Sequence, residues 1–413
     1  MPKPSRTPRP LMTPVSSILR RPGRSGSKGV LKKAVFVCYG GFDCNSAGHI
    51  AGFATELTRQ GLAVAVCARD PVANAYAFGP PAFEFFTLAD LVGDPKAVLG
   101  FDGAFDAAAS VMICWTPRKA SRRPTLKAAR ALGVPYVVHL EDNEDHLSAL
   151  RFGDEAGAAA KDAAERAELL AGAVGATVIE PRLKETLANG LPVQLLEPGV
   201  DHELFGAPLA PHRRASILRA LGAPADTAVM VYPGNIHRAN AGEMADLYRA
   251  VKRLRDQSRR LVLIKTGKDD VDMAALLGFA PAEAGVIQAG MLERAFLIDL
   301  VKCADLFVQP GAPGPFNDYR LPSKLPEFMA VGRPIVLPAT NLGLRLRHGE
   351  EALLLNTGSA EEIAGHIEAI LDDPALAARL AAGAQAFAKR AWRWDRQGKL
   401  LLDFLERLHR PAR

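Results

Sequence analysis

The chain has 413 residues, of which 48% are hydrophobic, so its length predicts two to three domains and its composition is sufficient for sizeable cores. The five cysteines are scattered, odd in number and never in CxxC spacing, so they indicate neither a disulfide framework nor a zinc site. No long uninterrupted apolar run is present, so no transmembrane helix is expected. These features predict a globular protein of the reducing cytoplasm.

The net charge of +6 is unevenly distributed. Residues 1–33 hold nine of the 51 lysines and arginines and no acid, which leaves a net charge of −3 for the remainder. This segment also contains several prolines and lacks the apolar core of a secretory signal, so we expect a disordered basic arm. The arm could bind weakly to the anionic inner face of the membrane as a peripheral contact. No nucleic acid is expected as a partner. A solubilising tail without function, or a misassigned start codon, would explain the same composition.

The first half of the chain alternates apolar runs with helical patterns. Residues 34–39 read as a buried strand that ends at two glycines, followed by a helix through residues 50–57 and a strand at 62–67, which together form a βαβ unit. The pattern then predicts further strands at residues 111–115, 134–140, 176–179 and 193–196, with helices at residues 118–130, 155–175 and 181–189 between them.

The pattern restarts after Pro198-Gly199-Val200. A strand at residues 228–232 ends in a glycine loop, and a helix begins at about residue 243. Later strands are predicted at residues 261–266, 285–289, 306–309, 334–337 and 353–355, and the chain ends in helices at 359–372, 374–390 and 395–409. Two similar openings indicate two similar domains, each a doubly wound α/β sheet. Ligands of such sheets bind at the carboxyl ends of the strands, so the loops there are expected to converge on one cleft.

Residues 317–337 combine a polar cluster, a short helix and a strand. Pro322 and Ser323 are typical of a helix start, and Arg320 and Lys324 lie at or near its N-terminus, where free backbone N–H groups favour an anion. Glu327 lies off the apolar face of this helix. The segment therefore predicts a site for a nucleoside diphosphate, although a solvated helix with a charged first turn would look similar.

Several motifs in this chain resemble one family of enzymes, the GT-B glycosyltransferases, and specifically the large retaining group called family four. The motifs are residues 308–310 with 321–336, residues 198–201 with Phe205, residues 348–354, and Trp394. The resemblance covers residues 34–408 and implies the GT-B architecture: two facing Rossmann-like domains, residues 34–200 on the acceptor side and 201–390 for the nucleotide-sugar, with residues 391–413 as a helix that returns to the first domain.

The resemblance also implies roles for residues of the second domain. Glu327 takes the position of the glutamate that binds the ribose of the nucleotide. The family's other glutamate, which contacts the transferred sugar, would lie eight positions earlier, where this chain has Tyr319; Asp318 is the nearest substitute. A basic pair that holds the diphosphate is replaced by Asn235 and Asn240. The implied donor-binding residues are Gly48, Gly234, Asn235, Lys265, Arg320, Ser323, Lys324 and Glu327.

In the first domain, two segments follow predicted strands. Gly48 and His49 lie where the family approaches the donor phosphates and the acceptor. His139 resembles a histidine near the anomeric carbon and is grouped with Asp318 and Tyr319 as catalytic, and Glu141 and Asp142 are expected on the acceptor side with His49. Metal binding and a solvated loop are competing interpretations of residues 139–146, but the resemblance implies chemistry without metal or cofactor.

The family resemblance implies transfer of a sugar from a nucleoside-diphosphate-sugar to a hydroxyl of a glycan, a lipid-linked acceptor or a small molecule, with retention at the anomeric carbon. A protein of the same fold that binds nucleotide or glycan without catalysis is the first alternative, because Tyr319 and the missing basic pair depart from the family pattern. A nucleotide-sugar epimerase or hydrolase is the second.

Overall fold

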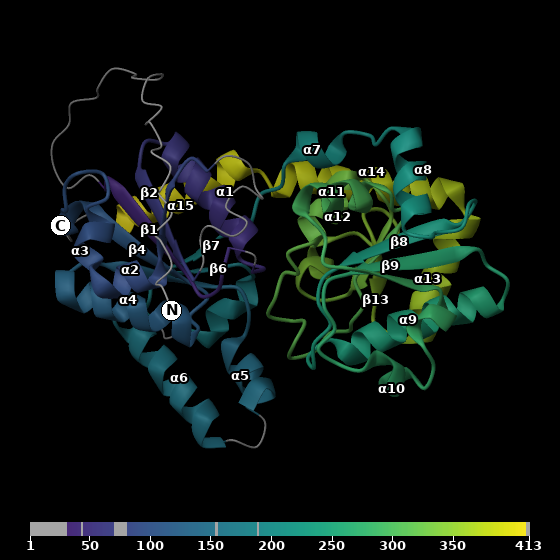
Figure 1. Ribbon diagram of the computed structural model, residues 1–413, viewed down its shortest axis with the longest axis horizontal. Coiled ribbons are helices and arrows are strands. Elements are labelled where there is room, and N and C mark those ends of the chain that lie inside the picture. The colour runs from purple at the N-terminus through teal and green to yellow at the C-terminus, as the bar shows by residue number, and fades with distance from the viewer. Residues whose placement is uncertain (1–30, 43, 70–80, 153–155, 188–189, 410–413) are drawn as a thin grey trace, which may run out of the picture.

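The computed structural model describes residues 31–42, 44–69, 81–152, 156–187 and 190–409, so most of the predicted basic arm lies outside the described residues. The chain forms two α/β lobes, one built around strands β1 to β7 and the other around β8 to β13 (Figure 1). Within the described ranges, no helix is long and apolar enough to cross a membrane.

The first lobe contains one parallel sheet of seven strands in the order β3-β2-β1-β4-β5-β6-β7. Its central strands are buried along their whole length, as expected for a parallel sheet that is covered on both faces. The strands are β1 (Lys33–Cys38), β2 (Ala63–Ala68), β3 (Glu84–Thr87), β4 (Ser110–Trp115), β5 (Tyr136–Leu140), β6 (Gly175–Val178) and β7 (Val193–Leu195).

Alternate side chains of these strands feed two separate cores. Phe36, Ile113 and their neighbours pack under α1 (Ala47–Arg59) and α15 (Trp394–His409), whereas Val35 and Met112 pack under helices of the opposite face. The helices of that face are α2 (Leu88–Gly93), α3 (Pro95–Leu99), α4 (Lys119–Leu132) and α6 (Ala156–Ala171). Helix α5 (Glu144–Phe152) pairs with α6, and the two project from the lobe (Figure 1). Short helices η1 (Ala107–Ala109) and η2 (Pro181–Thr186) complete the lobe.

The second lobe contains two parallel three-stranded sheets, β10-β9-β8 and β11-β12-β13, which a bridge between Met230 and Leu306 joins edge to edge. The strands are β8 (Ala228–Pro233), β9 (Leu261–Thr266), β10 (Val286–Gly290), β11 (Phe307–Val308), β12 (Ile335–Pro338) and β13 (Leu353–Leu355). The helices are α7 (His202–Gly206), α8 (Pro211–Ala220), α9 (Ala241–Asp256), α10 (Met273–Leu277), η3 (Pro281–Ala284), α11 (Arg294–Lys302), α12 (Leu325–Val331), η4 (Asn341–Arg345), α13 (Ala360–Asp372) and α14 (Pro374–Ala391).

Each lobe has one point where the strand order reverses. In the first lobe it lies between β1 and β4, and in the second between β8 and β11. At such a point the loops from the two neighbouring strands leave in opposite directions, and a crevice opens at the carboxyl end of the sheet. The loops that follow β1, β4, β8 and β11 therefore frame the ligand-binding edge of each lobe.

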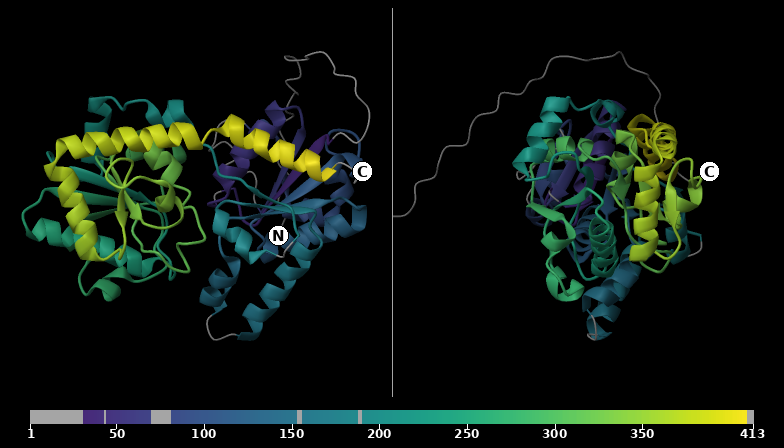
Figure 2. Two further views of the ribbon diagram at one scale, coloured as in Figure 1. Left: turned by 180° about the vertical axis from the view of Figure 1, so that it is seen from behind. Right: turned by 90° about the vertical axis from the view of Figure 1, so that its right-hand side faces the viewer.

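The C-terminal helices connect the two lobes, with α14 along the second and α15 on the first (Figure 2). Trp394 begins α15 and fits into a slot in the first lobe, where its ring meets the ring of Phe53 edge to face at 5.2 Å. A Cβ atom at Gly52 would lie 2.2 Å from this indole, and one at Gly199 would lie 2.5 Å from it. Glycine at both positions is therefore what admits the tryptophan.

Local structure departs from the predicted elements in several places. The run predicted as one helix over residues 155–175 is the 16-residue helix α6, and the polar segment after His139 leads into α5, which begins at Glu144. The edge strand β3 was not predicted, because its four residues, Glu-Phe-Phe-Thr, are too few for a clear pattern. The strand is only partly buried. The helix predicted to begin at Pro322 begins at Leu325 instead.

We expect Gly52→Ala to lower the free energy of unfolding by about 1–3 kcal/mol, because the added methyl group displaces Trp394 from its slot. Gly365→Ala in α13 is the matched control: open space surrounds that glycine, so the change should be neutral or stabilise by up to about 1 kcal/mol. Urea unfolding of both variants measures the difference. Equal stability of the two variants would contradict the role given to the slot.

Candidate functional site

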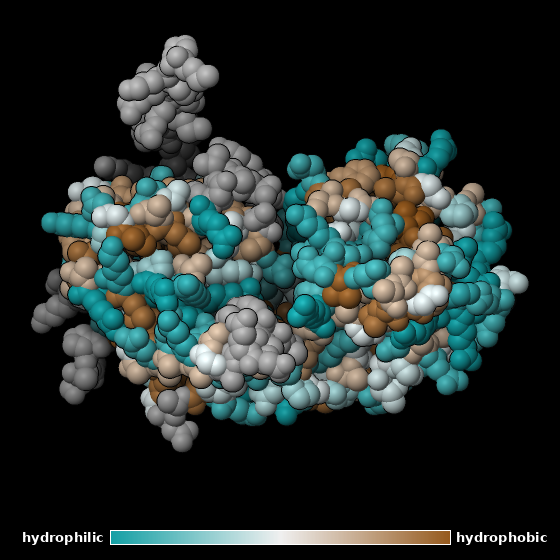
Figure 3. Space-filling view, turned by 60° about the horizontal axis from the view of Figure 1, so that its bottom comes forward, coloured by the Kyte–Doolittle hydropathy of each residue, from teal (hydrophilic) through white to brown (hydrophobic). Residues whose placement is uncertain are grey.

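Polar side chains from both lobes meet at the carboxyl ends of the sheets. Arg182, which follows β6, pairs with Asp318 of the second lobe at 2.9 Å, and the Tyr319 hydroxyl donates a hydrogen bond to Glu185 at 3.3 Å. The space-filling view shows the two lobes meeting along a crease with hydrophilic residues on both sides (Figure 3). Side chains of the two lobes thus meet across this crease.

Glu141 directly follows β5 and gathers three side chains from other elements. Its Oε2 accepts hydrogen bonds from the Ser46 hydroxyl and, at 2.8 Å, from the Thr116 hydroxyl. Its Oε1 lies 2.7 Å from Nδ1 of His49. We refer to Ser46, His49, Thr116 and Glu141 as the Glu141 cluster.

The Glu141 cluster holds an ionised carboxylate beside a histidine that has one nitrogen free. Burial opposes ionisation of Glu141, but the hydrogen bonds of His49 and Ser46 hold the pKa of its carboxyl well below the usual range. About a tenth of each of these two side chains, 12% for Glu141 and 10% for His49, is exposed. Because Nδ1 of His49 is engaged, Nε2 is left for a ligand, and no hydrogen bond to it is found in the part of the chain that the structure describes.

Thr116 adopts a strained backbone conformation at the end of β4, with φ at 55°. A β-branched residue in the left-handed region costs about 1–3 kcal/mol, and such strain is found mostly at functional sites. Here the conformation places the Thr116 hydroxyl within hydrogen-bond distance of Glu141, so the strained backbone is what allows Thr116 to join the cluster.

Asp142 and Arg118 lie next to the Glu141 cluster. Arg118 pairs with Glu144 at 3.2 Å, reaches Asp142 at 3.8 Å and covers the ring of Tyr39. Burial, together with the charges of Glu144 and Glu141, raises the pKa of Asp142 to about 6. Asp142 can therefore change its protonation state near neutral pH.

The second lobe carries a basic cluster at its own reversal point. Arg320 donates two hydrogen bonds to Oδ1 of Asn317, at 3.1 and 2.7 Å, stacks on Phe316 and pairs with Glu243 at 3.4 Å. Asn317 in turn donates to Glu243. We refer to Glu243, Asn317, Arg320 and Lys324 as the Arg320 cluster.

Lys324 supplies the second cation of this cluster. Its Nζ lies 3.7 Å from the centroid of the Tyr232 ring and would lie 3.3 Å from a Cβ at Gly234, whose φ of 146° suits glycine. Burial, followed by the positive charge of Arg320, lowers the pKa of Lys324 to about 7. An anion would stabilise the protonated form, so the cluster is suited to a phosphate group.

Glu327 is paired with Arg294 from the start of α11, as a bidentate ion pair. About 19% of the Glu327 side chain is exposed. A sugar hydroxyl that donates to Glu327 would therefore share the carboxylate with a guanidinium. Ser323 is exposed in the turn before α12, and Gly48 lies in the first turn of α1.

Two predicted site residues, Lys265 and His139, have other roles in the structure. Lys265 is fully buried, where its ammonium pairs with Asp269 and donates to the carbonyls of residues 267 and 268, so it cannot replace the missing basic pair. His139 is also fully buried, stacked on Trp115 and bonded to Thr177, because both faces of β5 are covered. Burial lowers the pKa of His139 to about 3.

The side chain of Asn235 was also predicted at the donor site. Its Oδ1 accepts the N–H of Lys268 at 2.8 Å, and its carbonyl accepts from Asn240 at 3.1 Å. Both asparagines therefore shape the loop after β8.

Asp318 and Tyr319, predicted as catalytic with Asp318 as the substitute for the family's glutamate, contact the first lobe. Asp318 accepts hydrogen bonds from Thr340 and from the N–H of Gly314, in addition to its ion pair with Arg182. The Tyr319 ring packs under Arg182 and its hydroxyl reaches Glu185. Tyr319, the residue that departs from the family pattern, thus takes part in a contact between the two domains.

Sequence reasoning missed the residues that hold the site together. Ser46, Thr116 and Glu243 lie far along the chain from their partners, so no local pattern marks them. Asn341, with φ at 40°, anchors the 317–320 segment by donating to two of its carbonyls. Asparagine followed by leucine and glycine is a turn signal, which would have drawn attention to Asn341.

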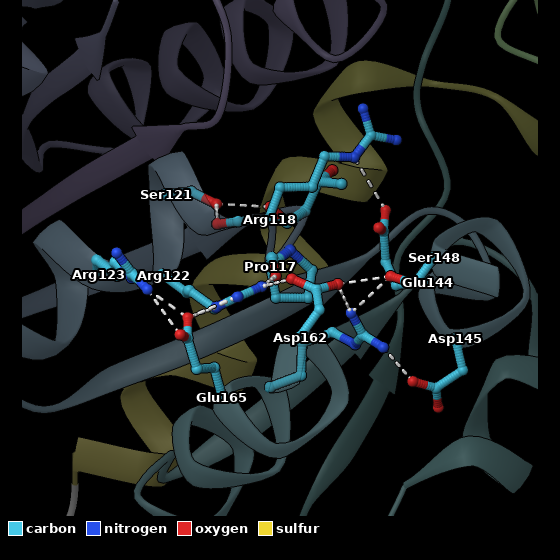
Figure 4. Close-up of polar contacts among 12 residues, drawn as sticks. Pro117, Arg118, Ser121, Arg122, Arg123, Glu144, Asp145, Ser148, Asp162 and Glu165 are labelled. Atoms are coloured by element: carbon cyan, nitrogen blue, oxygen red, sulfur yellow. Dashed lines mark hydrogen bonds and ion pairs between the residues drawn. The ribbon is translucent and has the colours of Figure 1, made fainter. Parts of the chain in front are cut away.

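A groove of about 630 Å³ lies elsewhere, on the outside of the first lobe between α4 and α6. Its buried Arg122 pairs with Asp162 at 2.7 Å and with Glu165 at 2.6 Å, and Arg123 shares Glu165 (Figure 4). Because these charges compensate one another, we assign them to the attachment of α6. Among the described residues, no group of three or more His, Cys, Asp or Glu is arranged to hold a metal ion.

Comparison with known proteins agrees with this geometry. Residues 227–373 match the family model described as Glycosyl transferases group 1. A D-inositol 3-phosphate glycosyltransferase of Thermobispora bispora is 30% identical over 256 residues, which cover 58% of this chain and 57% of that protein. The chain spans about half the length of the curated relatives that it matches.

Solved structures resemble nearly the whole chain. HepE of Anabaena in complex with UDP-glucose has a TM-score of 0.67 at 18% identity, covering 91% of this chain and 99% of HepE. Sucrose-phosphate synthase of Thermosynechococcus elongatus has a TM-score of 0.68 at 15% identity, covering 91% and 98%. The predicted GT-B fold and the resemblance to group 1 glycosyltransferases are confirmed.

We expect Asp142→Asn to stabilise the protein at pH 8 by about 1–2 kcal/mol, a value reduced for the 29% exposure of this side chain. The pKa rises from an ordinary 3.8 to about 6 on folding, so between these values the folded state holds a proton that the unfolded state has lost. The free energy of unfolding therefore falls as pH rises through this window, and the gain from asparagine should shrink toward zero at pH 4. Urea unfolding at both pH values measures this; a gain of equal size at pH 4 would contradict the explanation.

Proposed function

We propose that this chain, which has the GT-B fold and carries a group 1 glycosyltransferase domain at residues 227–373, transfers a sugar from a nucleoside-diphosphate-sugar to an acceptor hydroxyl. The observation that carries the proposal is the Arg320 cluster, with two cations at the reversal point of the second sheet. The positive charge of Arg320 acts on Asp142, which lies next to the Glu141 cluster, so donor and acceptor would meet between the two clusters.

The Arg320 cluster would hold the diphosphate. Arg320 is oriented by Asn317 and Glu243, so its remaining N–H groups are fixed before a ligand arrives. Lys324 is half-buried between the Tyr232 ring and the Gly234 loop, and it would gain a proton when the diphosphate binds. Two cations and no metal would then neutralise the leaving group as the glycosidic bond breaks.

Glu327 would accept hydrogen bonds from the ribose. Its pairing with Arg294 fixes the orientation of the carboxylate, and the exposed part of the side chain remains available to hydroxyl groups. Fixing this group before the nucleotide binds reduces the entropy lost on binding.

The Glu141 cluster would orient the acceptor. His49 is held by Glu141 through Nδ1, so its Nε2 can accept a hydrogen bond from the attacking hydroxyl. We further propose retention: a phosphate oxygen of the departing diphosphate accepts the proton of the attacking hydroxyl, and both lie on the same face of the sugar. Closure of the lobes, secured by Arg182 and Asp318, would exclude water that would hydrolyse the donor.

HepE of Anabaena has been solved in complex with UDP and with UDP-glucose, and this supports a nucleotide-sugar as the donor. The acceptor is a hydroxyl of a glycan, a lipid-linked glycan or a small molecule. We place the reaction in the cytoplasm, and contact with the inner membrane face rests only on the basic sequence of residues 1–33.

A binding protein without catalysis is the second candidate, favoured by one observation. Asp318 and Tyr319 occupy the place of the family's sugar-binding glutamate, and both are engaged by the first lobe. Incubation with the nucleotide-sugar alone separates the candidates: a transferase releases nucleoside diphosphate slowly by hydrolysis, an epimerase changes the sugar, and a binding protein leaves the donor intact.

Lys324→Met should weaken UDP binding at least tenfold, because one charge-assisted contact to the diphosphate is lost. Above pH 7 the wild type must protonate Lys324 on binding, so its affinity should fall by up to about tenfold per pH unit, and the variant should lose this dependence. Lys268→Met, at an exposed position nearby, is the charge-matched control. Calorimetry from pH 6 to 9 tests this; an unchanged pH profile in Lys324→Met would overturn the assignment.

Glu327→Ala should abolish donor turnover while the protein stays folded, because the ribose loses its acceptor. Glu361→Ala, at a side chain that is 81% exposed, is the control. Release of nucleoside diphosphate is measured together with the melting temperature. Wild-type rates in Glu327→Ala would remove this residue from the site.

A further inference from the structure

Two thiols lie close together beside the Glu141 cluster. Cys38 is the last residue of β1, and Cys44 lies in the loop that leads to α1. Their sulfur atoms are 3.5 Å apart, against about 2.05 Å in a disulfide. The other three cysteines, Cys67, Cys114 and Cys303, are buried.

The backbone of the loop brings Cys44 back onto the strand. The N–H of Cys44 donates to the carbonyl of Gly41 at 3.1 Å, and Ala47 donates to the carbonyl of Cys44 at 3.0 Å. A Cβ at Gly40 would lie 3.0 Å from Cβ of Cys44, so glycine is what permits the approach. The two thiols are therefore held together by the fold.

The two thiols differ in environment. Cys44 is half-buried, and its hydrogen bonds with the Cys38 thiol, the backbone of Ser46 and the Tyr39 side chain lower its pKa despite burial. Cys38 is buried, and its hydrogen bond to Cys44, with burial, raises its pKa. The negative charge of Glu141 has the opposite effect and raises the pKa of Cys44. A partly exposed thiol of lowered pKa beside a buried thiol of raised pKa is the arrangement in which the first reacts with an oxidant and the second resolves the product.

We propose that Cys38 and Cys44 form a site of reversible oxidation, in which hydrogen peroxide converts the pair to a disulfide. The Cys44 thiolate attacks one peroxide oxygen, the O–O bond breaks, and the leaving hydroxide takes a proton to become water. The Cys38 thiol then attacks the sulfur of the Cys44 sulfenic acid, the S–O bond breaks, and a second water leaves with the Cys38 proton. The two sulfurs together lose two electrons, and the peroxide gains them.

Closure of the disulfide moves Cys44, which lies shortly before two members of the Glu141 cluster, Ser46 and His49. The sulfur atoms must approach by about 1.5 Å, the difference between their separation and a disulfide bond. Ser46 follows Cys44 by two residues and His49 by five, and both bond to Glu141. The oxidised protein should therefore lose sugar transfer and keep nucleotide binding, a consequence that rests on the proposed function.

Peptide mapping tests the site directly. Trypsin releases residues 34–59, which contain Cys38 and Cys44, and residues 60–69, which contain only Cys67. After brief treatment of the folded protein with hydrogen peroxide, then unfolding with N-ethylmaleimide, we expect peptide 34–59 to lose two hydrogen atoms and carry no maleimide. Peptide 60–69 should carry one. Two maleimides on peptide 34–59, or sulfinic acid at Cys44 beside a free Cys38, would overturn the proposal.

Variants separate the two thiols. In Cys38→Ser, dimedone should trap the sulfenic acid on Cys44, and in Cys44→Ser, oxidation of Cys38 should be at least tenfold slower than oxidation of Cys44 in Cys38→Ser. Cys303→Ser, which changes a distant buried thiol, should behave as wild type. If Cys38→Ser does not fold, as judged by its melting temperature, Cys38→Ala replaces it, and the wild-type map decides the proposal on its own.

The effect on the cleft is measured separately. Calorimetry with UDP and turnover of the nucleotide-sugar are compared before oxidation, after it and after reduction with dithiothreitol. Turnover should fall at least fivefold on oxidation and return on reduction, with nucleotide affinity unchanged. No turnover before oxidation would count against the proposed function alone; turnover unaffected by a mapped disulfide would refute the link to the cluster and leave the oxidation site in place.

Discussion

The carboxylate of Glu141 fixes the edge of the first lobe. It lies at the end of a buried strand, where three side chains from the loops after β1 and β4 converge on it. A buried carboxylate must have such partners, because an unpaired one would cost several kcal/mol, on the order of the penalty for a buried charge. The need to satisfy Glu141 therefore positions His49, strains Thr116 and sets the start of α1.

Glu243 has the matching role in the second lobe. It lies in the first turn of α9, after the loop from β8, and it binds Asn317 and Arg320 from the loop after β11. In both lobes an acidic side chain thus ties together the loops that part at the reversal of strand order. The two clusters differ in the side chains that lie beside the carboxylate. The Glu141 cluster contains a histidine, which suits an acceptor, whereas the Arg320 cluster contains two cations, which suit a diphosphate.

Much of the fold could be predicted from the sequence, because parallel strands that are covered on both faces are continuous apolar runs. The carboxyl-end rule then placed Arg320, Lys324, His49 and Glu141 on the cleft. Lys265 shows where this reasoning fails. The sequence around a lysine near a strand end is the same whether the lysine binds a ligand or, as here, pairs with Asp269 four residues later. His139 fails for a related reason, since a polar residue inside a doubly covered strand is buried on either face.

Contacts between the lobes are harder still to predict. The pairing of Arg182 with Asp318 joins residues 136 positions apart in the sequence, and the site of Tyr319 depends on how the lobes meet. The family pattern assigns the position of Tyr319 to a glutamate that contacts the sugar, whereas the structure uses both Asp318 and Tyr319 in contacts with the first lobe. Only tertiary contacts could reveal that use.

The most direct test of this account is calorimetric titration of the purified protein with UDP, GDP, ADP and dTDP at neutral pH in the presence of a chelator. The account predicts that one of these nucleotides binds with a dissociation constant on the order of micromolar without metal, because Arg320 and Lys324 supply the positive charge. Failure of all four to bind, or binding only after magnesium is added, would contradict it.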